Sequence, residues 1–329
     1  TTRLVGSEMC IRDRYEDTEL VSRITETERL HQQAWNKVLY KSDAGLHGVT
    51  PWYAEDYDDS DWEKVDMFSD NWAIRNGRPL NGVHWFRKDF FVPEDWSGKE
   101  AVLRLGCIVD ADSVFVNGHF VGTVSYQYPP RIYKVPSKLL KKGKNQLTVR
   151  LFSYGGRPSF VKEKPYKLIC DGKEVNLEGG WKHKIGTVMP PSPSSTAFHY
   201  TPVGLYNGMI YPLRHYTFKG VVWYQGESNV GRWSEYSSLL SALIADWRTL
   251  FKDENLPFYI IELADFLAPD DPGRAAWAEL RKQQAKTARE NAHVTLIKNS
   301  DTGEWNDIHP LDKKTAATRL VEAVIQNEK

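Results

Sequence analysis

The sequence predicts an α/β domain with a parallel sheet and, ahead of it, an all-β sandwich. Three observations support this. The chain has 329 residues, and a single hydrophobic core rarely grows beyond about 250–300 residues. Short strand patterns separated by turn residues fill residues 44–186, which is typical of a sandwich. After Met189, strand and helix patterns alternate, as in a parallel sheet covered by helices.

The N-terminal part contains one predicted helix. From Tyr15 to Leu39, apolar residues recur near helical spacing, and they are Leu20, Ile24, Leu30, Ala34 and Val38. The preceding residues 1–14 show neither a helical nor a strand period. They resemble a translated sequencing adaptor at the end of a metagenomic reading frame, so we expect a non-native segment and a protein that begins upstream.

The sandwich is predicted from several strand patterns. In the run from Trp85 to Val92, the side chains of Phe86, Phe90 and Val92 fall on one face. Asn117-Gly118 separates two short strand patterns, and this pair is preferred in two-residue hairpin turns because both positions need φ > 0. The run from Leu147 to Leu151 alternates strictly between apolar and polar residues, which predicts a strand.

The α/β domain is predicted from alternating patterns beyond a Pro/Ser-rich loop at residues 190–195. The expected strands are Val221–Tyr224, as a buried parallel strand, then Pro257–Ile261 and Val294–Ile297. Three helices are expected from residues at helical spacing. The first has one face marked by Tyr236, Leu239, Leu240, Leu243, Trp247 and Leu250, the second is traced by Trp277, Leu280, Gln284 and Ala288, and the third carries Ala316, Leu320 and Val324. Asp312 is placed to cap the last helix.

Composition narrows the possible partners. Lys plus Arg and Asp plus Glu each number 43, and a nucleic-acid binder usually has a basic excess. No apolar stretch approaches the roughly 18 residues of a membrane span. Cys107 and Cys170 lie too far apart in sequence for a Cys-x-x-Cys zinc site, and the sequence does not decide whether they pair. We therefore expect no nucleic acid, no membrane span, no metal and no cofactor.

Two loops at the ends of predicted parallel strands carry residues suited to chemistry, because ligands bind at that edge of open α/β sheets. The first runs from Trp223 to Asn229 and places Gly226 between amide and carboxyl side chains. The second runs from Asp301 to Pro310 and contains Asp307 and His309. A carboxylate near a histidine can orient the imidazole, as in a triad. The plain alternatives are a polar turn and a surface Asp and His.

The strand-rich block resembles the galactose-binding-like jelly roll found beside many glycosidase and esterase domains. The resembling segments are residues 58–62, 82–88, 116–118 and 140–145. Such modules are often structural, and direct sugar binding is the alternative.

The rest of the chain is similar to the sialate O-acetylesterase family of SGNH (GDSL-type) hydrolases. The matching motifs lie in order at residues 205–213, 219–229, 246–248, 256–258, 280–284 and 307–310. The resemblance covers about Trp35 to Glu322 and implies an SGNH-type three-layer α/β/α domain, with the jelly roll inserted. It also implies removal of O-acetyl groups from sialic acids or other acetylated glycans, in the periplasm or outside the cell.

The resemblance assigns roles to residues of this chain. His309 is the base and then the acid of serine esterase chemistry, and Asp307 orients it. Gln225 and Gly226 form the oxyanion hole. Glu227 and Asn229 shape the loop or bind substrate. Asn207 and Arg281 line the pocket.

Two departures from the family pattern concern catalysis. The family aspartate usually stands three residues before the histidine, where this chain has Asn306, whereas Asp307 is two before. The family nucleophile lies in a Gly-Gln-Ser-Asn-Met block before the jelly roll, and no such block occurs here. Ser7 is a poor echo of it, and Ser228 does not fit a Gly-x-Ser-x-Gly elbow. We therefore expect an inactive fragment without its nucleophile and a parallel sheet that lacks a strand.

The expected domains are a suspect segment (1–14), a remnant of the N-terminal esterase part (15–43), the sandwich (44–187) and the C-terminal esterase part (188–329). Two alternative functions remain. A retaining glycosidase is suggested by Glu227 and Glu262, which follow predicted strands, although too few residues follow the sandwich for a (β/α)₈ barrel of about 250 residues. A non-catalytic carbohydrate-binding protein is consistent with the missing nucleophile.

Overall fold

The computed structural model describes residues 18–198 and 203–327. It divides into two units, Thr1–Thr196 and Ala197–Lys329. The predicted segment 1–14 lies outside the described residues. The helix predicted from Tyr15 to Leu39 falls in the first unit, together with the strand-rich region. The assignment of residues 15–43 to the esterase domain stays a prediction.

The first helix, α2 (Thr18–Ser42), buries Trp35 and Leu39. The apolar repeat that predicts the helix does not mark its buried face, because Leu30 and Val38 are 49% and 53% exposed. The large Trp35 side chain decides the orientation of the helix: it is buried against the core and donates a hydrogen bond from Nε1 to the Pro190 carbonyl at 3.0 Å. The predicted loop at residues 190–195 has no regular structure.

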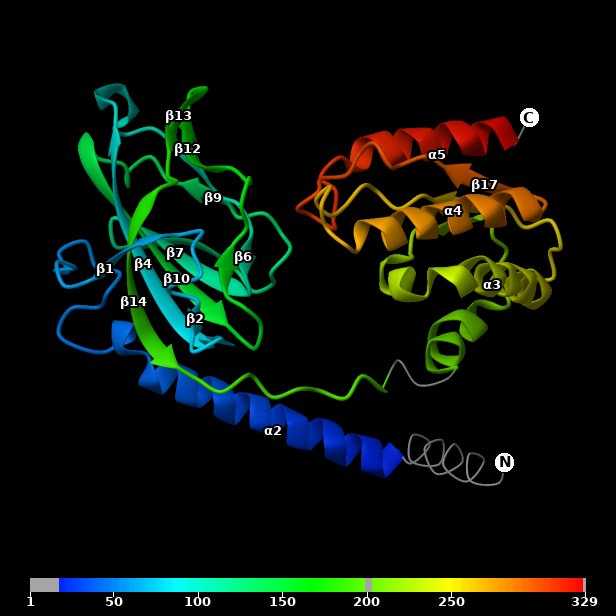
Figure 1. Ribbon diagram of the computed structural model, residues 1–329, viewed down its shortest axis with the longest axis horizontal. Coiled ribbons are helices and arrows are strands. Elements are labelled where there is room, and N and C mark those ends of the chain that lie inside the picture. Colours follow the sequence, from blue (N-terminus) through cyan, green and yellow to red (C-terminus); the bar gives the residue numbers. More distant parts are fainter. Residues whose placement is uncertain (1–17, 199–202, 328–329) are drawn as a thin grey trace. The chain divides into compact units, whose positions relative to one another are not determined.

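Two antiparallel sheets form the main body of the first unit (Figure 1). The larger has the order β1-β14-β4-β10-β7-β8, with bounds β1 (Glu63–Asp66), β14 (Gly180–Val188), β4 (Gly82–Val92), β10 (Gly143–Ser153), β7 (Ala111–Val116) and β8 (His119–Val124). The smaller has the order β13-β12-β5-β9, with bounds β13 (Lys173–Asn176), β12 (Tyr166–Cys170), β5 (Ala101–Leu105) and β9 (Ile132–Val135).

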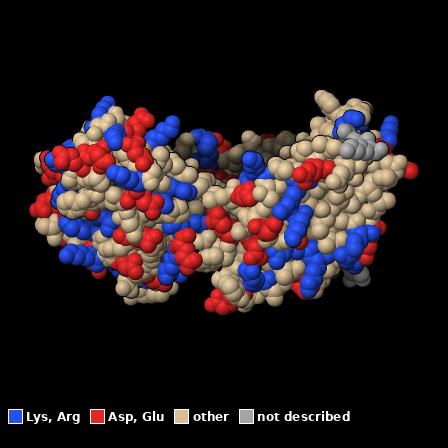
Figure 2. Space-filling view, turned by 90° about the horizontal axis from the view of Figure 1, so that it is seen from above, with Lys and Arg blue, Asp and Glu red and all other residues tan. Residues whose placement is uncertain are grey.

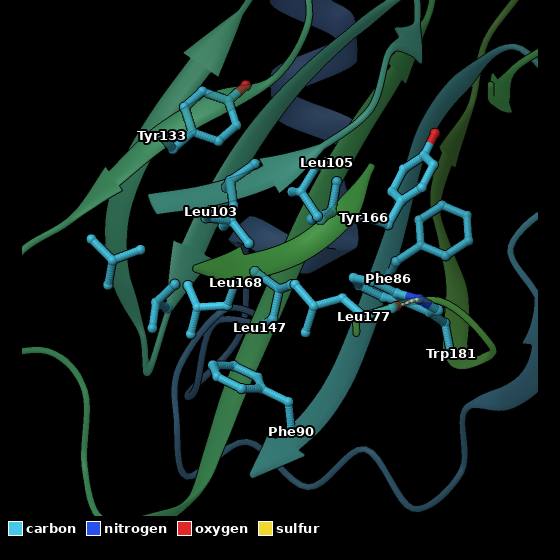
Figure 3. Close-up of a cluster of buried hydrophobic side chains, with 14 of the residues drawn as sticks. Phe86, Phe90, Leu103, Leu105, Tyr133, Leu147, Tyr166, Leu168, Leu177 and Trp181 are labelled. Carbon is cyan, nitrogen blue, oxygen red and sulfur yellow. Dashed lines mark hydrogen bonds between the residues drawn. The ribbon is translucent and has the colours of Figure 1, made fainter. Parts of the chain in front are cut away.

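Short elements complete this unit: β2 (Ile74–Arg75), β3 (Arg78–Pro79), β6 (Ile108–Val109), β11 (Ser159–Phe160), η1 (Ala44–Leu46) and η2 (Glu94–Trp96). One buried cluster takes side chains from both large sheets, including Phe86 and Leu147 from one and Leu103 and Leu168 from the other. Figure 3 shows these side chains meeting between the sheets. The two sheets are therefore packed face to face, as in the predicted sandwich.

The hairpin of β7 and β8 confirms the turn predicted from sequence. Val116 pairs with His119, so Asn117 and Gly118 form a two-residue loop. Their φ angles are 48° and 79°, the positive values that a type I′ turn requires. The Asn117 side chain also donates to the Leu139 carbonyl at 2.7 Å, which ties the turn to the rest of the unit.

Strand β10 contains the strand predicted at residues 147–151 and is buried on both faces. One face enters the inter-sheet core, and the other carries Arg150, which is only 5% exposed. Arg150 Nε donates to Asp43 Oδ2 at 2.8 Å, and Trp85 Nε1 donates to Asp43 Oδ1 at 2.8 Å. A second apolar cluster with Trp35, Leu39 and Trp85 covers this face. Alternation in the sequence does not reveal such a cover, because Arg150 is polar.

The second unit has a three-stranded parallel sheet in the order β15-β16-β17. The strands are β15 (Val221–Trp223), β16 (Phe258–Ile261) and β17 (Val294–Ile297), and the helical elements are η4 (Tyr206–Ile210), η5 (Tyr211–Leu213), η6 (Glu227–Glu235), α3 (Tyr236–Phe251), α4 (Arg274–Glu290) and α5 (Lys313–Asn327). Helices α3 and α4 pack with Phe258 and Ile260 in one cluster, whereas α5 packs with Tyr259 and Ile261 in another. The sheet thus lies between two helical layers.

Two details of this unit differ from the predictions. Strand β15 is parallel as expected, but it lies at an edge of the sheet and Val222 is 51% exposed. Helix α3 turns Ile244 inward, whereas Leu239 is 51% exposed. Apolar runs in the sequence do not distinguish a central from an edge strand, so only the structure shows where β15 lies in the sheet. That a strand is missing from the sheet stays a prediction.

Other features of the described residues bear on the predictions. The Asp312 side chain accepts the Thr315 amide at 3.0 Å, which confirms the predicted cap of α5. Cys107 and Cys170 are both buried and are not joined by a disulfide. Among the described helices, none has both the length and the apolarity needed to cross a membrane. Charges of both signs are mixed over the face seen in Figure 2.

Candidate active site

The residues that follow the three parallel strands meet at the carboxyl ends of these strands. Tyr224 follows β15, Glu262 follows β16 and Asn299 comes two residues after β17. Asn299 Nδ2 donates to the Tyr224 hydroxyl at 3.0 Å. The amides of Asn299 and Ser300 donate to Glu262 Oε2 at 3.2 and 3.1 Å. These bonds join the three strand ends into one framework, at the edge where open α/β sheets bind ligands.

The carbonyl of Gln225 is held from inside the unit. It accepts the Tyr236 hydroxyl at 2.8 Å and Gln284 Nε2 at 3.2 Å. Gln284 is fully buried and also accepts the Leu263 amide at 2.9 Å. The Gln225 side chain is fixed as well, because its Nε2 donates to Asn229 Oδ1 at 2.7 Å. The loop after β15 is therefore rigidly attached to α3, α4 and the end of β16.

This arrangement directs the Gly226 amide. In a planar trans peptide, the carbonyl of one residue and the N–H of the next point in opposite directions. Because the Gln225 carbonyl points toward Tyr236 and Gln284, the Gly226 N–H points away from them. This N–H makes no hydrogen bond with the described residues. An oriented backbone donor without a partner is the kind of group that stabilises an oxyanion.

Glycine at position 226 is required by both conformation and space. Its φ is 153°, and a Cβ here would lie 2.6 Å from Leu280 Cδ2. We expect Gly226→Ala to lower the free energy of unfolding of the second unit by about 1–3 kcal/mol, because the loop must take strain or move. Chemical denaturation followed by circular dichroism measures this.

Gly231→Ala is the matched control for that substitution. Gly231 lies in the same element, η6, and a Cβ there would meet nothing within 4 Å. A loss of stability equal to that of Gly226→Ala would contradict the requirement for glycine at position 226.

The loop containing His309 packs against the loop after β16. The Leu267 amide donates to the Trp305 carbonyl at 2.9 Å, and Gly303 lies against the Asp265 backbone so closely that no Cβ fits. Ile308 packs on the cluster formed by α3, α4 and the sheet. The His309 loop is thus anchored at the same sheet edge as the Gln225 loop.

The Asp307 side chain accepts a hydrogen bond from the His309 backbone amide. Asp307 is 6% exposed, and its Oδ1 accepts the His309 amide at 2.9 Å. His309 itself is exposed, and Pro310 after it is buried. The carboxylate therefore fixes the backbone at His309. Its predicted action on the imidazole stays a prediction.

The other predicted site residues are distributed over the second unit. Glu227 is the first residue of η6, and the Asn229 side chain accepts a hydrogen bond from Gln225. Arg281 Nη1 donates to Asp265 Oδ1 at 3.1 Å. Asn207 is exposed on η4, and among the described residues its side chain makes no hydrogen bond that would tie it to the Gln225 loop.

Four residues of this framework were missed as site residues by sequence reasoning: Tyr224, Tyr236, Gln284 and Asn299. Gln284 recurs at helical spacing with Trp277 and Leu280, and a glutamine in such an apolar repeat is a signal that it has a buried hydrogen-bond partner. Burial raises the pKa of the Tyr236 and Tyr224 hydroxyls, so both remain hydrogen-bond donors at neutral pH.

No group of three or more His, Cys, Asp or Glu side chains in the described part of the chain is arranged to hold a metal ion. The arrangement at the sheet edge offers amide donors, a histidine and carboxylates. These groups are suited to proton transfer and to stabilising a negative charge on oxygen.

Comparison with known families assigns both parts of the chain. Residues 181–326 match the model described as "Carbohydrate esterase, sialic acid-specific acetylesterase". Residues 22–181 match the model described as "Glycosyl hydrolases family 2, sugar binding domain". The resemblance of the C-terminal part to sialate O-acetylesterases is therefore confirmed. The N-terminal match includes most of α2, in agreement with its place in the first unit.

Curated relatives include the sialate O-acetylesterases of Mus musculus and Rattus norvegicus. The first is 33% identical, over 35% of this chain and 24% of its own length. The second is 32% identical, over 48% of this chain and 30% of its own length. The chain thus spans at most about a third of these relatives.

Among solved structures, a carbohydrate acetylesterase from Xanthomonas citri is 20% identical and covers 72% of this chain and 74% of its own, with a TM-score of 0.36. A β-glucuronidase from Ruminococcus gnavus is 20% identical and covers 36% of this chain and 22% of its own, with a TM-score of 0.25.

Proposed function

We propose a function from one premise: residues 181–326 match the sialic acid-specific acetylesterase family of carbohydrate esterases. From this premise we infer that the protein removes O-acetyl groups from sialic acids or related acetylated glycans. The observation that carries the proposal is the oriented peptide at Gln225 and Gly226, which lies on the same sheet edge as the His309 loop.

In the proposed mechanism, a serine hydroxyl attacks the acetyl carbonyl and His309 takes its proton. The Gly226 N–H and an Nε2–H of Gln225 stabilise the tetrahedral oxyanion. A single side-chain donor of this kind is worth about 2.7–4 kcal/mol in other enzymes. His309 then returns the proton to the leaving sugar hydroxyl, and water hydrolyses the acetyl-enzyme by the same route. Asp307 holds the segment that carries His309.

The nucleophile is not Ser228 in this proposal. Ser228 is exposed, and among the described residues its hydroxyl makes no hydrogen bond, so it has no base within reach in this structure. An activated serine needs such a base at about 2.6–3.2 Å. We therefore propose that the serine comes from a part of the SGNH-type α/β/α domain outside the described residues, and that residues 18–327 alone have little esterase activity.

Hydrolysis of 4-nitrophenyl acetate and of an O-acetylated sialic acid by this chain tests the proposal, with His309→Ala as the control. We expect no activity above that of His309→Ala from the chain alone. In a longer protein that includes the nucleophilic serine, we expect His309→Ala to lower the esterase activity by about 10²–10⁴-fold. Activity of the chain alone that His309→Ala abolishes would show that the chain contains its nucleophile. Substitution of Ser228 and of Ser7 would then separate the two candidates, and dependence on Ser228 would disprove the proposed location of the serine.

The N-terminal unit supports a second, subordinate role. Because residues 22–181 match a sugar binding domain, we propose that this unit helps to hold the glycan. That match concerns the sugar binding part of family 2, so it does not favour the retaining-glycosidase alternative. A periplasmic or secreted location also belongs to the proposal, and cell fractionation tests it.

A further inference from the structure

The Tyr224 side chain reaches across the end of the parallel sheet. Tyr224 follows β15 and Asn299 comes two residues after β17, with β16 between these strands. Neighbouring strands lie about 4.8 Å apart, so the two backbones are separated by about two strand spacings. Asn299 Nδ2 nevertheless donates to the Tyr224 hydroxyl at 3.0 Å. The two side chains, the Tyr224/Asn299 pair, therefore span the middle strand.

Tyr224 contacts the chain on both sides of the His309 loop. This loop, residues 301–310, begins two residues after Asn299, and α5 begins with Lys313 shortly after it ends. Lys313 Nζ lies 6.0 Å from the centroid of the Tyr224 ring, within the usual range of a cation–π interaction. The hydroxyl of Tyr224 therefore meets the segment before the loop, and its ring meets the segment after the loop.

Asn299 transmits the position of the Tyr224 hydroxyl to the loop itself. It is 1% exposed, its Oδ1 accepts the Thr302 hydroxyl at 2.7 Å and its carbonyl accepts the Thr302 amide at 3.2 Å. Its own amide donates to Glu262 Oε2 at 3.2 Å. Because a buried polar group is costly to leave without a partner, these bonds hold the asparagine in one place, and the start of the His309 loop with it.

The other end of the pair is joined to the peptide that carries the proposed oxyanion donors. Tyr224 directly precedes Gln225, whose carbonyl accepts hydrogen bonds from Tyr236 and Gln284. Those bonds direct the Gly226 N–H, but they come from α3 and α4 and do not reach the His309 loop. Tyr224 supplies the missing link, because one side chain joins the segment with the donors to the segment with the proposed base.

A second tyrosine–asparagine contact in the same sheet lacks these neighbours. Asn327 Nδ2 donates to the Tyr259 hydroxyl at 3.4 Å and to Thr295 Oγ1 at 3.2 Å. Asn327 lies at the other end of α5 from Lys313, about 21 Å along the helix at 1.5 Å per residue. Tyr259 thus takes part in a hydrogen bond of the same kind that is remote from the His309 loop, and it provides a matched control.

We propose that Tyr224 is a positioning residue of the esterase site, which sets the His309 loop relative to the donors at residues 225 and 226. The inference rests on the proposed function, since it concerns the donors and the base of the same reaction. Tyr224 touches no reacting atom and acts through Asn299. Misplacement of a catalytic group slows the chemical step more than it weakens substrate binding, so the pair should affect kcat rather than KM.

Tyr224→Phe tests the link in the chain as it stands, because it keeps the ring and removes only the hydroxyl. In NMR spectra of the ¹⁵N-labelled protein, we expect the amide signals of Thr302 and His309 to shift. Hydrogen exchange of the Thr302 amide should become about tenfold faster, because its acceptor Asn299 loses a support. Tyr259→Phe should leave these signals unchanged. Signals of the His309 loop that are the same in Tyr224→Phe and in the unchanged protein would overturn the inference.

Kinetics separate a positioning role from a merely structural one. In a longer protein that includes the nucleophilic serine, Tyr224→Phe should lower kcat for 4-nitrophenyl acetate about tenfold, with KM changed less than about twofold. Adding Tyr224→Phe to Asn299→Ala should lower kcat no further than Asn299→Ala alone, because the hydrogen bond is already absent. A kcat equal to that of Tyr259→Phe, or a loss that appears only in KM, would overturn the inference.

The two proposals fail in different ways, because the NMR measurement does not require the nucleophile. Coupled signals in a protein that never hydrolyses the ester, even with the serine present, would disprove the esterase activity and leave the link between the loops. Ester hydrolysis that Tyr224→Phe does not slow would disprove the positioning role and leave the esterase.

Discussion

Replacing Arg131 by methionine is expected to lower the free energy of unfolding of the sandwich by about 3–5 kcal/mol, because an unpaired buried charge is left behind. Arg131 and Asp112 are both fully buried, and Arg131 Nε donates to Asp112 Oδ2 at 2.6 Å. The remaining guanidinium donors bind four backbone carbonyls, those of Gln127, Pro129, Ile108 and Asp110. Methionine fills similar space, but it removes the counter-charge of Asp112, which keeps only the Tyr133 hydroxyl as a side-chain donor, and it leaves these carbonyls without the guanidinium donors.

Hydrogen exchange of amides in β10 measures the effect, because this central strand opens only when the sandwich unfolds. Arg104→Met is the control. Arg104 lies on β5, where it pairs with Ile132 next to Arg131, but it is only partly buried and makes no side-chain hydrogen bond or ion pair with the described residues. The double variant Arg131→Met with Asp112→Leu should recover part of the loss, because it removes the stranded charge. Equal stabilities of Arg131→Met and Arg104→Met would contradict the argument.

Lowering the pH from 7 to 5 is expected to destabilise the same unit through a buried histidine pair. His84 Nδ1 and His183 Nε2 lie 3.0 Å apart, and the His84 Nε2 is hydrogen-bonded to the Leu80 carbonyl at 2.8 Å. The rings stack beside Trp72 and Phe86. Burial lowers the pKa of His84 to about 4 and that of His183 to about 3, and the neighbouring His84 contributes to the latter.

Stability falls with falling pH because the unfolded chain binds more protons than the folded unit. Both histidines have a folded pKa below the value of about 6.5 expected in the unfolded chain, so between these values the unfolded chain binds more protons. Stability is therefore complete above about pH 6.5 and is lost as the pH falls toward the folded values. The loss between pH 7 and pH 5 is on the order of 2 kcal/mol for each histidine, in a range where most carboxylates still remain charged.

Urea denaturation at several pH values measures this slope. His183→Phe should reduce it, because the pair loses one titrating ring while an aromatic side chain still fills the space. His31→Phe is the control, since His31 is exposed on α2 and should leave the slope unchanged. A slope that is the same in all three proteins would show that other groups cause the acid sensitivity.

Much of the fold could be predicted from local sequence signals. The Asn117-Gly118 turn, the Asp312 cap and the order of strands and helices in the second unit depend on residues near one another in the chain, and the structure agrees with them. Local signals do not show burial that a distant segment decides. Arg150 is buried because Asp43 and Trp85, which are distant in the sequence, contact it. Val222 is exposed because β15 lies at an edge of the sheet.

The candidate site divides in the same way. The sequence by itself determined its ingredients, namely Gln225 and Gly226 after one strand and Asp307 and His309 in a later loop, because their type and spacing follow a family pattern. Only the tertiary structure decided that Gln284 and Tyr236 donate hydrogen bonds to the Gln225 carbonyl, and that Arg281 donates a hydrogen bond to Asp265. Such orientations depend on hydrogen bonds between residues far apart in the chain, and no local pattern encodes them.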